Sequence, residues 1–282
     1  MGIVIGIDIG GSTTKIVGIS GSEPNRPVTP MLVKAADPVA SLFGAFGKFV
    51  DHNLLALADI SRIMITGVGA SFIDRPIYGL PTGKAAEFLC NGYGGLYLSG
   101  LERAVICSMG TGTALVSASG EDIEHMGGTG IGGGTIIGLA ARMINVHDTE
   151  LISRLAEDGD LNNVDLMVGD ITQTALPGLP PHTTASNFGK LKDMATPNDI
   201  ALGILNLVFE SIGVTASFAV KSTGVRDIVL IGNLTTIPHC AYVFDQLRDL
   251  LGINFIIPEH SEYGTALGAA LVERRGRYAK LI

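Results

Sequence analysis

The amino-acid sequence predicts an α/β fold built from two copies of a βββαβα unit with a nucleotide cleft between them. Three observations lead to this prediction. Glycine- and threonine-rich hairpins open at residues 5–19 and 105–118, and each is followed by a similar order of strands and helices. The 38 glycines and the low share of charged residues, 16%, suit a protein with many tight strand-to-helix turns. The length of 282 residues fits two domains, which we place at 1–103 and 104–282.

The first half is expected to begin with a hairpin and to end with a helix that follows a buried strand. A helix should start at Pro38, because apolar residues then recur at helical spacing. The segment RIMIT is apolar and short, as a buried strand is, and it ends in a Gly-Val-Gly turn. The expected strands are 3–9, 13–19, 31–35 and 62–66, and the last helix spans roughly 82–98.

The second half is expected to repeat this order with an insertion. Its strands are expected at 104–109, 113–118, 122–126 and 227–232, with a helix from about Gly132 and helices on either side of 253–257. Residues 147–225 should be mostly helical, but the proline-rich stretch LPGLPPHTTASNFG at 176–189 cannot form a regular element. We interpret this stretch as a loop over the mouth of the cleft, with an ordinary surface connection as the alternative.

Composition excludes several classes of partner. A net charge of −8 and the lack of a Lys/Arg stripe argue against nucleic acid. No apolar run approaches the ~20 residues of a membrane span, so no membrane partner is expected. Cys90, Cys107 and Cys240 are far apart in apolar sequence, which indicates reduced core thiols and a cytoplasmic protein.

The two hairpins predict a phosphate site. Each tip should present bare backbone N–H groups and hydroxyls, which bind phosphate oxygens. Asp8 ends the first strand, and a carboxylate beside phosphates calls for Mg²⁺ between them, held by Asp8 through water. From these features the chain is expected to be an ATP-dependent phosphotransferase. The expected ATP contacts here are Asp8, Ile9, Gly10, Gly11, Ser12, Thr13, Thr14 and Lys15, together with Thr111 of the second hairpin.

Two further segments of the second half are candidate nucleotide contacts. A glycine run feeds the helix near Gly132, and a helix N-terminus offers unpaired N–H groups and a positive dipole end. The strand IVLI ends at a Gly-Asn turn, where an adenosine could lie against the glycine. The expected contacts are Gly133, Gly134, Thr135, Ile136 and Ile137 at the helix, and Gly232 and Asn233 at the strand end. A plain Gly-rich crossover and a plain turn are the structural alternatives.

Three residues are candidates for contact with the acceptor substrate. Glu87 lies in mostly apolar sequence and could take the proton from an attacking hydroxyl, although a lone helical Glu is most often a solvated surface charge. Thr111 can reach either a phosphate or the acceptor. His125 precedes the glycine run and could contact an anionic substrate, although a partly exposed strand His is the commoner case.

Four segments, in this order along nearly the whole chain, resemble type II pantothenate kinases of the actin-like ATPase and sugar kinase superfamily. They are DIGGSTTK at 8–15, GTGT at 110–113, GGTGIGGGT at 127–135 and TASNFG at 184–189. The resemblance implies duplicated actin-like (ribonuclease H-like) domains and a homodimer. It also implies ATP-dependent phosphorylation of pantothenate to 4′-phosphopantothenate, the first step of coenzyme A biosynthesis.

The same resemblance assigns roles to individual residues. The family's catalytic Glu falls on Glu87 and its hydroxyl contact to substrate on Thr111. Members usually carry an Arg before the glycine run to hold the pantothenate carboxylate, and this chain has His125 there. An Arg is a permanent bidentate clamp whereas a His is only partly charged near neutral pH, so carboxylate affinity should be weaker or supplied by another residue.

Two alternative functions share parts of this pattern. ATPase activators of 2-hydroxyacyl-CoA dehydratases have the same DIGGSTTK start, but they hold an iron–sulfur cluster through cysteines, and the three cysteines here have the wrong surroundings. A catalytically weak relative that binds nucleotide or coenzyme A is the second alternative, motivated by the missing Arg. Repressor-type sugar kinases are disfavoured because their zinc-binding cysteine cluster is absent.

Overall fold

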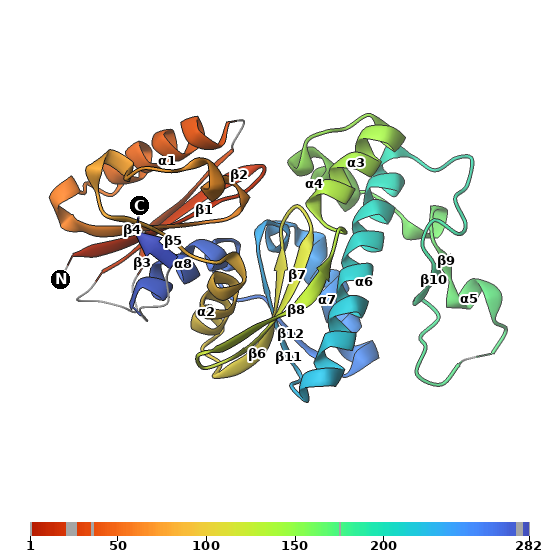
Figure 1. Cartoon of the computed structure of the whole chain (residues 1–282). Helices are drawn as coiled ribbons and strands as arrows, with labels where there is room; N and C mark the ends of the chain where they lie inside the picture. The colour runs from red at the N-terminus through yellow and green to blue at the C-terminus, as the bar shows by residue number, and fades with distance from the viewer. Residues whose placement is uncertain (1, 21–26, 35–36, 175, 275–278, 282) are drawn as a thin grey trace.

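In the computed structural model, the described residues form two large β-sheets that lie side by side, with helices on the faces of each, and a separate two-stranded sheet (Figure 1). The structure describes residues 2–20, 27–34, 37–174, 176–274 and 279–281. The first sheet lies at the left of Figure 1 beneath α1, and the second lies at the centre against α6 and α7.

The two sheets have the same strand order, so the predicted duplication is confirmed. In each, three antiparallel strands are followed by two that run parallel to the first of them. The first sheet contains β1 (Ile3–Ile9), β2 (Thr13–Ile19), β3 (Pro27–Lys34), β4 (Ile60–Thr66) and β5 (Thr82–Lys84), in the order β3-β2-β1-β4-β5, with β13 (Ala279–Leu281) added beyond β5. The second contains β6 (Arg103–Met109), β7 (Thr113–Ser119), β8 (Asp122–Thr129), β11 (Asp227–Ile231) and β12 (Asn254–Ile256), in the order β8-β7-β6-β11-β12.

The helices follow the predicted order with one correction. Residues 82–84, expected to open a helix, form the short strand β5, and the helix begins at Glu87. Hydrogen bonding of these three residues beside β4 outweighs their helical pattern. The third strand begins earlier than expected, at Pro27, and residue 35 lies outside the described residues. The helices are α1 (Pro38–His52), α2 (Glu87–Ser99), α3 (Gly133–Ile144), α4 (Thr149–Glu157), α5 (Val168–Ile171), α6 (Pro197–Thr223), α7 (Pro238–Leu251) and α8 (Gly264–Arg274).

Local signals in the sequence explain where α1 begins and which face it buries. The Asp37 side chain accepts a hydrogen bond from the N–H of Ala40, and Pro38 occupies the first turn, where no N–H partner is needed. Leu42, Phe46 and Phe49 then recur on one face and are fully buried against the first sheet. Burial of this face fixes α1 above the sheet.

Helices α2 and α8 form a close pair between the two sheets (Figure 1). Helix α2 packs on strands of the second sheet, whereas α8, near the C-terminus, packs on strands of the first. Glycines allow this approach: a Cβ added at Gly94 would overlap the carbonyl oxygen of Gly264, and one added at Gly268 would overlap that of Cys90. Backbone therefore touches backbone where the halves meet.

Helix α6 departs from one expectation. By length and composition, α6 is apolar enough to span a membrane, although the sequence analysis expected no apolar run of that length. However, 61% of its most apolar stretch is buried inside the protein, where Ile204, Val208 and Phe209 belong to the core of the second half. The helix is therefore explained as a core helix that covers the second sheet.

The loop at 176–189 does not cover the cleft, so that interpretation is wrong. Figure 1 shows β9 (Leu166–Met167) and β10 (Thr184–Ser186) on the far side of α6 from the sheets. Thr184 and Asn187 donate hydrogen bonds to the carboxylate of Glu210 on α6, at 2.8 and 2.9 Å. These bonds tie the loop to the outer face of α6.

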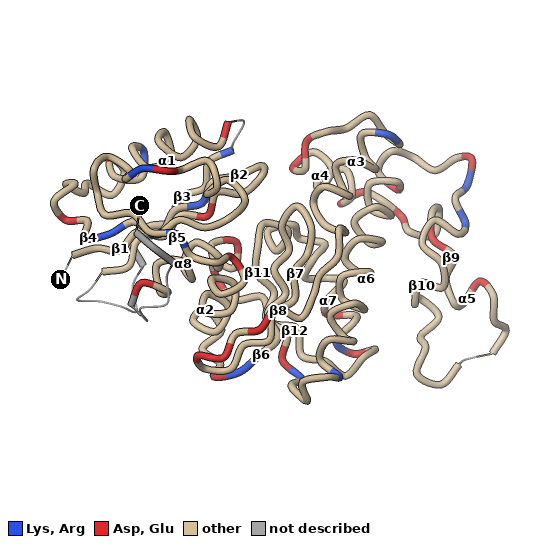
Figure 2. The backbone as a smooth tube through the Cα atoms, in the orientation of Figure 1, with Lys and Arg blue, Asp and Glu red and all other residues tan. Residues whose placement is uncertain are grey.

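Charged residues are interspersed in sign along the described chain. Figure 2 shows Lys and Arg scattered among Asp and Glu, with no basic stripe over either sheet in the part that the structure describes.

The three cysteines are free and buried, as expected. Burial raises the pKa of Cys90 and of Cys107 to about 12, and it also raises the pKa of Cys240. Because the thiolate is the reactive form, we expect native protein to resist an aromatic disulfide reagent at mildly alkaline pH, and all three thiols to react in concentrated guanidinium chloride. Absorbance of the released thiolate measures both rates. Rapid modification of native protein would contradict this placement.

Candidate active site

A cleft of about 500 Å³ lies between the two sheets and is lined by both glycine-rich hairpins. The turn of the first hairpin faces that of the second: a Cβ placed on Gly11 would lie 3.7 Å from the hydroxyl oxygen of Thr111. The predicted site residues that line the cleft are Asp8, Gly10, Gly11, Ser12, Thr13, Lys15, Glu87, Thr111, Gly133, Gly134, Ile137, Gly232 and Asn233.

Asp8 is the buried acidic group of the cleft. It is the penultimate residue of β1, where it pairs with Lys15 on β2 and Thr66 on β4. Its Oδ2 lies 3.6 Å from Nζ of Lys15. Burial raises the pKa of Asp8, and the Lys15 ammonium opposes that effect only in part. The carboxylate is therefore poorly compensated and would gain from a cation.

Room for Asp8 depends on a glycine that follows β4. Gly67 has φ of +84°, in the left-handed region that favours glycine. A Cβ at this position would lie 2.6 Å from Oδ1 of Asp8 and from the carbonyl oxygen of Ile9. The chain thus passes directly against the carboxylate, which explains the Gly-Val-Gly segment seen in the sequence.

The first hairpin turn offers backbone donors to a ligand. Gly10 N–H closes the turn on the carbonyl of Thr13 at 3.0 Å. The N–H groups of Gly11 and Ser12 donate to no backbone carbonyl among the described residues. Two donors beside Lys15 suit phosphate oxygens.

The start of α3 holds the second hairpin turn. The N–H of Gly133 donates to the carbonyl of Gly110 at 2.9 Å, and that of Gly134 donates to the carbonyl of Thr111 at 3.0 Å. The expectation of unpaired N–H groups at these two glycines is therefore wrong, because the turn uses them. A Cβ at Gly132 would lie 2.7 Å from the Thr111 carbonyl oxygen, so glycine is needed for this contact. Gly133 and Gly134 still border the cleft, where a phosphate can approach closely.

Glu87 is the first residue of α2 and lies in the cleft wall, where solvent still reaches it. Desolvation by the surrounding protein raises the pKa of its carboxyl group, and the nearby charge of Asp8 raises it further, while Lys15 opposes both. An acceptor hydroxyl in the cleft would meet a carboxylate with increased proton affinity. Such a group can act as a general base.

Gly232 forms the far wall of the cleft at the end of β11. Its φ is +99°, and a Cβ there would lie 2.5 Å from the carbonyl oxygen of Met109 on β6. Its N–H donates to the Ser261 carbonyl at 3.0 Å. Asn233 and Leu234 continue the wall into a 3₁₀ turn. These three lining residues carry no charge, as suits an adenosine site.

Five residues expected at the site do not border the cleft. The side chains of Ile9, Thr14 and Ile136 are fully buried in the protein. The hydroxyl of Thr135 donates to the Gly130 carbonyl and accepts from the N–H of Gly132, both at 3.2 Å. His125 lies on β8 outside the cleft lining, and its ring stacks on Phe88 with centroids 3.7 Å apart. Phe88, the stacking partner, directly follows Glu87 in the sequence.

Sequence reasoning missed several hydroxyl residues of the cleft. Ser108 and Thr113 flank the second turn and could have been found from the same motif. Thr129, Thr149 and Thr265 come from three other elements, and no local pattern marks them. The hydroxyl of Thr265, at the start of α8, donates to the side-chain amide oxygen Oδ1 of Asn91 on α2 at 2.8 Å, which connects the cleft to the central helix pair.

The duplicated strand order and the facing hairpins define the actin-like ATPase fold. Two solved structures share it. The activator of 2-hydroxyisocaproyl-CoA dehydratase from Clostridium difficile, with bound ADPNP, gives a TM-score of 0.68 at 17% identity, covering 99% of each chain. A ROK family glucokinase from Streptomyces griseus, in complex with glucose and AMPPNP, gives 0.62 at 13% identity, covering 98% of this chain and 100% of that one.

Within this fold class the chain belongs to the Fumble family, whose model matches residues 104–271. Two similar relatives are type II pantothenate kinases of Staphylococcus aureus. The one from strain USA300 is 27% identical over 282 residues, covering 96% of this chain and 99% of the relative. The one from strain MRSA252 is 29% identical over 274 residues, covering 94% and 96%.

Proposed function

We propose that this protein transfers the γ-phosphoryl group of ATP to the hydroxyl of pantothenate, giving 4′-phosphopantothenate. One observation carries the proposal: both hairpins face a single cleft whose wall holds a carboxylate, Glu87, of raised pKa. The type II pantothenate kinases that match almost the whole chain support the choice of substrate. The reaction would be the first step of coenzyme A biosynthesis.

Different residues of the cleft would bind the phosphates, accept the proton and hold the adenosine. The free N–H groups of the first turn and Lys15 would bind phosphate oxygens, and Thr111 would hold the phosphate or the acceptor from the opposite side. Glu87 would accept the proton of the attacking hydroxyl. The wall at Gly232 and Asn233 would hold the adenosine. Approach of the two halves would exclude water and suppress ATP hydrolysis.

The cleft suits Mg²⁺ held through a single carboxylate. No group of three or more His, Cys, Asp or Glu gathers among the described residues, so a cage made only of protein ligands is not offered there. Mg²⁺ commonly uses one or two carboxylates, waters and substrate phosphates. Asp8, buried and poorly compensated, is the group that would hold it through water. The ion would supply positive charge to the phosphates.

A product assay tests the proposal. Purified protein with ATP and Mg²⁺ should form ADP and phosphorylated pantothenate in equal amounts, measured by a coupled assay and mass spectrometry. A panel of pantothenate, N-substituted pantothenamides and common sugars defines the acceptor. ADP release that is the same with every acceptor, or with none, would contradict the kinase proposal.

The proposed role of Glu87 predicts how kcat decreases at acidic pH. Because the pKa of its carboxyl group is raised above the usual 4.5, the base is lost by protonation at a higher pH than for an ordinary glutamate. We expect kcat to fall as pH decreases, with an apparent pKa above 4.5, at saturating substrates. The residual rate of Glu87→Gln should lack this limb, which separates it from titration of Asp8. A limb at or below 4.5 would contradict the role.

His125 should change the preference for the acidic end of the substrate. Stacking on Phe88 keeps the His125 ring beside the start of α2. However, an imidazole is not a permanent cation, whereas the guanidinium of an Arg is. We expect kcat/KM for pantothenate and for a neutral pantothenamide to differ by less than about tenfold, and His125→Arg to favour the acid. Unchanged selectivity in the variant would place the carboxylate elsewhere.

The protein is also proposed to be a cytoplasmic homodimer. The three free, buried thiols support a reducing compartment, and the resemblance to type II pantothenate kinases supports the dimer. Sedimentation at micromolar concentration tests the assembly. A monomer at that concentration would contradict it.

An ATPase activator is the second candidate, favoured by the TM-score of 0.68 with a dehydratase activator. Such a protein would hold an iron–sulfur cluster, but all three cysteines of this chain are buried and separate. Iron analysis of anaerobically purified protein decides the matter, because an iron-free, colourless preparation removes this candidate. Tight nucleotide binding without transfer to any acceptor would instead favour a weakly catalytic nucleotide- or coenzyme A-binding relative.

A further inference from the structure

One side of α2 carries two polar residues at its start. Glu87 opens the helix and Asn91 follows four residues later, so the two are neighbours on one face, with Cβ atoms about 5–6 Å apart. The same face packs on α8, because Asn91 and Gly94 both contact its first residues. Glu87 and Thr265 of α8 both line the cleft. Asn91 therefore lies next to the cleft without lining it.

The side chain of Asn91 is a buried amide with only one end bonded. Its exposed fraction is 0%. Oδ1 accepts the hydrogen bond of the Thr265 hydroxyl at 2.8 Å. Nδ2 is buried and makes no hydrogen bond within the described part of the chain. Because a buried N–H2 group without an acceptor costs free energy, a second partner for Asn91 would stabilise the protein.

The Glu87 carboxylate is the acceptor to which the Asn91 amide can turn. Side chains of a helix lean toward its N-terminus, so that of Asn91 lies over the turn that begins with Glu87. The charges of Asp8 and Lys15 act on Glu87, but no hydrogen bond to its carboxylate is found among the described residues. An unpaired donor and an unpaired acceptor thus lie one helical turn apart.

Close contact between α2 and α8 limits how far the amide can move away. A Cβ at Gly94 would lie 1.9 Å from the carbonyl oxygen of Gly264, and one at Gly268 would lie 1.8 Å from that of Cys90. Helices that touch backbone to backbone on both sides of Asn91 have little freedom to slide or rotate. The bond from Thr265 then holds the amide beside the first turn of α2.

A ligand in the cleft would increase the need for this donor. Solvent still reaches the Glu87 carboxylate in the open cleft. Bound nucleotide displaces water from the cleft, and a carboxylate that loses water needs a protein donor to remain ionised. Asn91 is uncharged and supplies N–H groups without adding a cation that would neutralise the base.

We propose that Asn91 is a positioning residue for Glu87: its N–H2 group, held by Thr265, donates a hydrogen bond to the Glu87 carboxylate when nucleotide occupies the cleft. The bond aims the carboxylate at the acceptor hydroxyl and favours its ionised form. Asn91 acts through Glu87 and touches no substrate. The inference rests on the function proposed for Glu87, but the hydrogen bond itself can be observed without turnover.

The paired replacement Asn91→Leu with Thr265→Val tests the role with little disturbance of the fold. Apolar side chains of similar shape replace both partners, so no buried group is left unpaired and the melting temperature should change little. We expect kcat with pantothenate to fall about 10- to 100-fold, the range of a hydrogen bond to a charged group, and KM for ATP to stay within about threefold. A folded variant with full kcat would overturn the proposal.

A double-mutant cycle separates positioning from a structural role. Asn91→Leu alone should lower kcat about 10- to 100-fold. In the Glu87→Gln background no base remains to be positioned, so the same replacement should lower the residual kcat by less than about twofold. Equal losses in the two backgrounds would mean that Asn91 supports only the fold.

Side-chain amide NMR tests the hydrogen bond without catalysis. In the ¹⁵N-labelled full chain, the Asn91 N–H2 signals are identified by their loss in Asn91→Leu. We expect AMPPNP with Mg²⁺ to move these signals downfield, and Glu87→Met, which keeps the length but lacks the oxygens, to abolish the movement. Signals that do not move, or that move equally in Glu87→Met, would contradict the proposal. Movement in a chain that phosphorylates no acceptor would refute the kinase function and leave the hydrogen bond standing.

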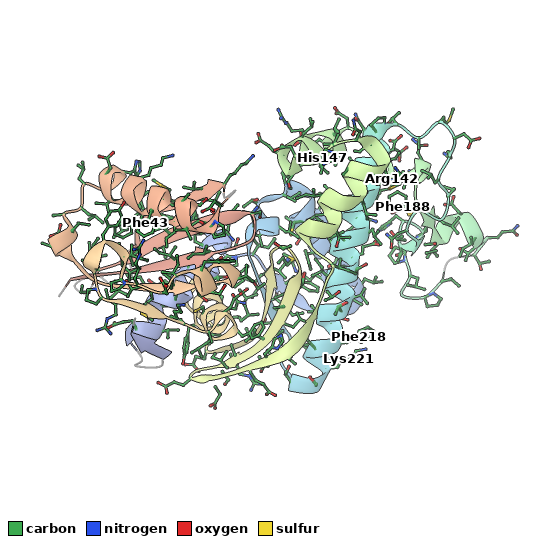
Figure 3. All side chains as sticks on the ribbon, turned by 45° about the horizontal axis from the view of Figure 1, so that its top comes forward. Phe43, Arg142, His147, Phe188, Phe218 and Lys221 are labelled. Atoms are coloured by element: carbon green, nitrogen blue, oxygen red, sulfur yellow. The ribbon has the colours of Figure 1, made fainter. Side chains whose placement is uncertain are left out.

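Two variants control for a general loss of stability. Ser217→Ala removes a buried hydroxyl of α6 that donates to the Val214 carbonyl at 2.7 Å. Figure 3 shows Phe43 on α1, and Phe43→Leu removes a ring that meets Tyr78 with centroids 5.4 Å apart. Neither residue lines the cleft. Both variants should melt at lower temperature and keep kcat within about twofold. A loss of kcat as large as that of Asn91→Leu would rule out a specific role for Asn91.

Discussion

Replacement of Glu87 by Gln is expected to lower kcat with pantothenate by about 100- to 10,000-fold, the usual contribution of a general base. The amide keeps the shape of the side chain at the start of α2 but cannot take up the proton of the attacking hydroxyl. ATP affinity should remain within about threefold, because Glu87 is assigned to the acceptor and not to the phosphates. Steady-state rates and ATP binding by calorimetry measure the two effects.

Glu150→Gln is the matched control for this change. Glu150 also lies in the first turn of a helix, α4, but it is exposed and does not line the cleft. Its replacement should leave kcat within about twofold. Full activity in Glu87→Gln would remove the proposed base, and equal losses in both variants would point to a general effect of charge.

Replacement of Gly268 by Ala is expected to have the largest effect on stability. The added methyl would overlap the carbonyl oxygen and carbon of Cys90, which are backbone atoms of α2 that cannot turn aside. We expect the free energy of unfolding to fall by about 3 kcal/mol or more, at the upper end of overpacking effects. Urea unfolding followed by circular dichroism measures the change.

Gly47→Ala provides the opposite expectation at another helical glycine. Gly47 is exposed within α1, and a Cβ there meets nothing within 4 Å. Alanine should therefore stabilise the protein by about 0.5–1 kcal/mol, because it favours the helix and restricts the unfolded chain. If Gly268→Ala were as mild as Gly47→Ala, the close contact between α2 and α8 would be wrong.

Local chemistry made much of the fold predictable. The turn glycines and the short apolar strands identified both hairpins, and Pro38 with the apolar residues at helical spacing after it marked the start of α1. Repetition of that order in the second half then implied the duplicated sheets. These features depend on residues close together in the sequence, where spacing alone carries the signal.

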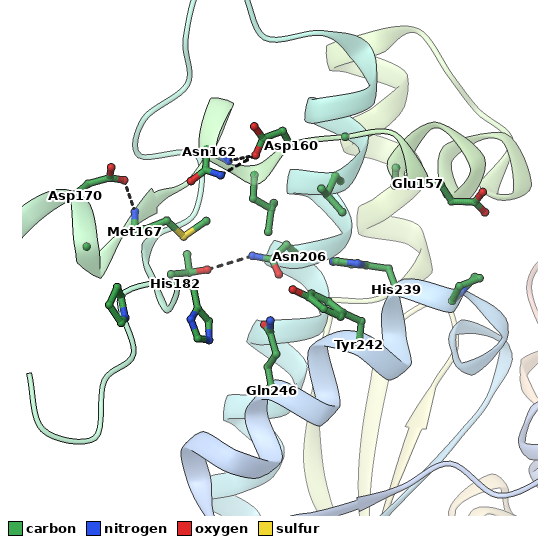
Figure 4. Close-up of a pocket in the computed structure, with 18 of the residues that line it drawn as sticks. Glu157, Asp160, Asn162, Met167, Asp170, His182, Asn206, His239, Tyr242 and Gln246 are labelled. Carbon is green, nitrogen blue, oxygen red and sulfur yellow. Dashed lines mark hydrogen bonds between the residues drawn. The ribbon is translucent and has the colours of Figure 1, made fainter. Parts of the chain in front are cut away.

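Features that depend on distant contacts were not predictable in the same way. Residues 82–84 form a strand because β4 lies beside them, and the loop at 176–189 lies behind α6 because Glu210 accepts its hydrogen bonds. The N–H groups of Gly133 and Gly134 are occupied by carbonyls of a turn more than twenty residues earlier. A cavity of about 800 Å³ is lined by residues of α4, α6 and α7 (Figure 4), and no sequence motif connects these helices.

The crossed packing of α2 and α8 has a consequence for synthesis on the ribosome. Val4, Val17 and Met64 of the first sheet are buried in one cluster with Ala266 and Ala270 of α8. While the intervening residues are being translated, the underside of that sheet has no helix of its own to cover it. The first sheet therefore reaches its native packing only after α8, about two hundred residues later in the chain, has emerged from the ribosome.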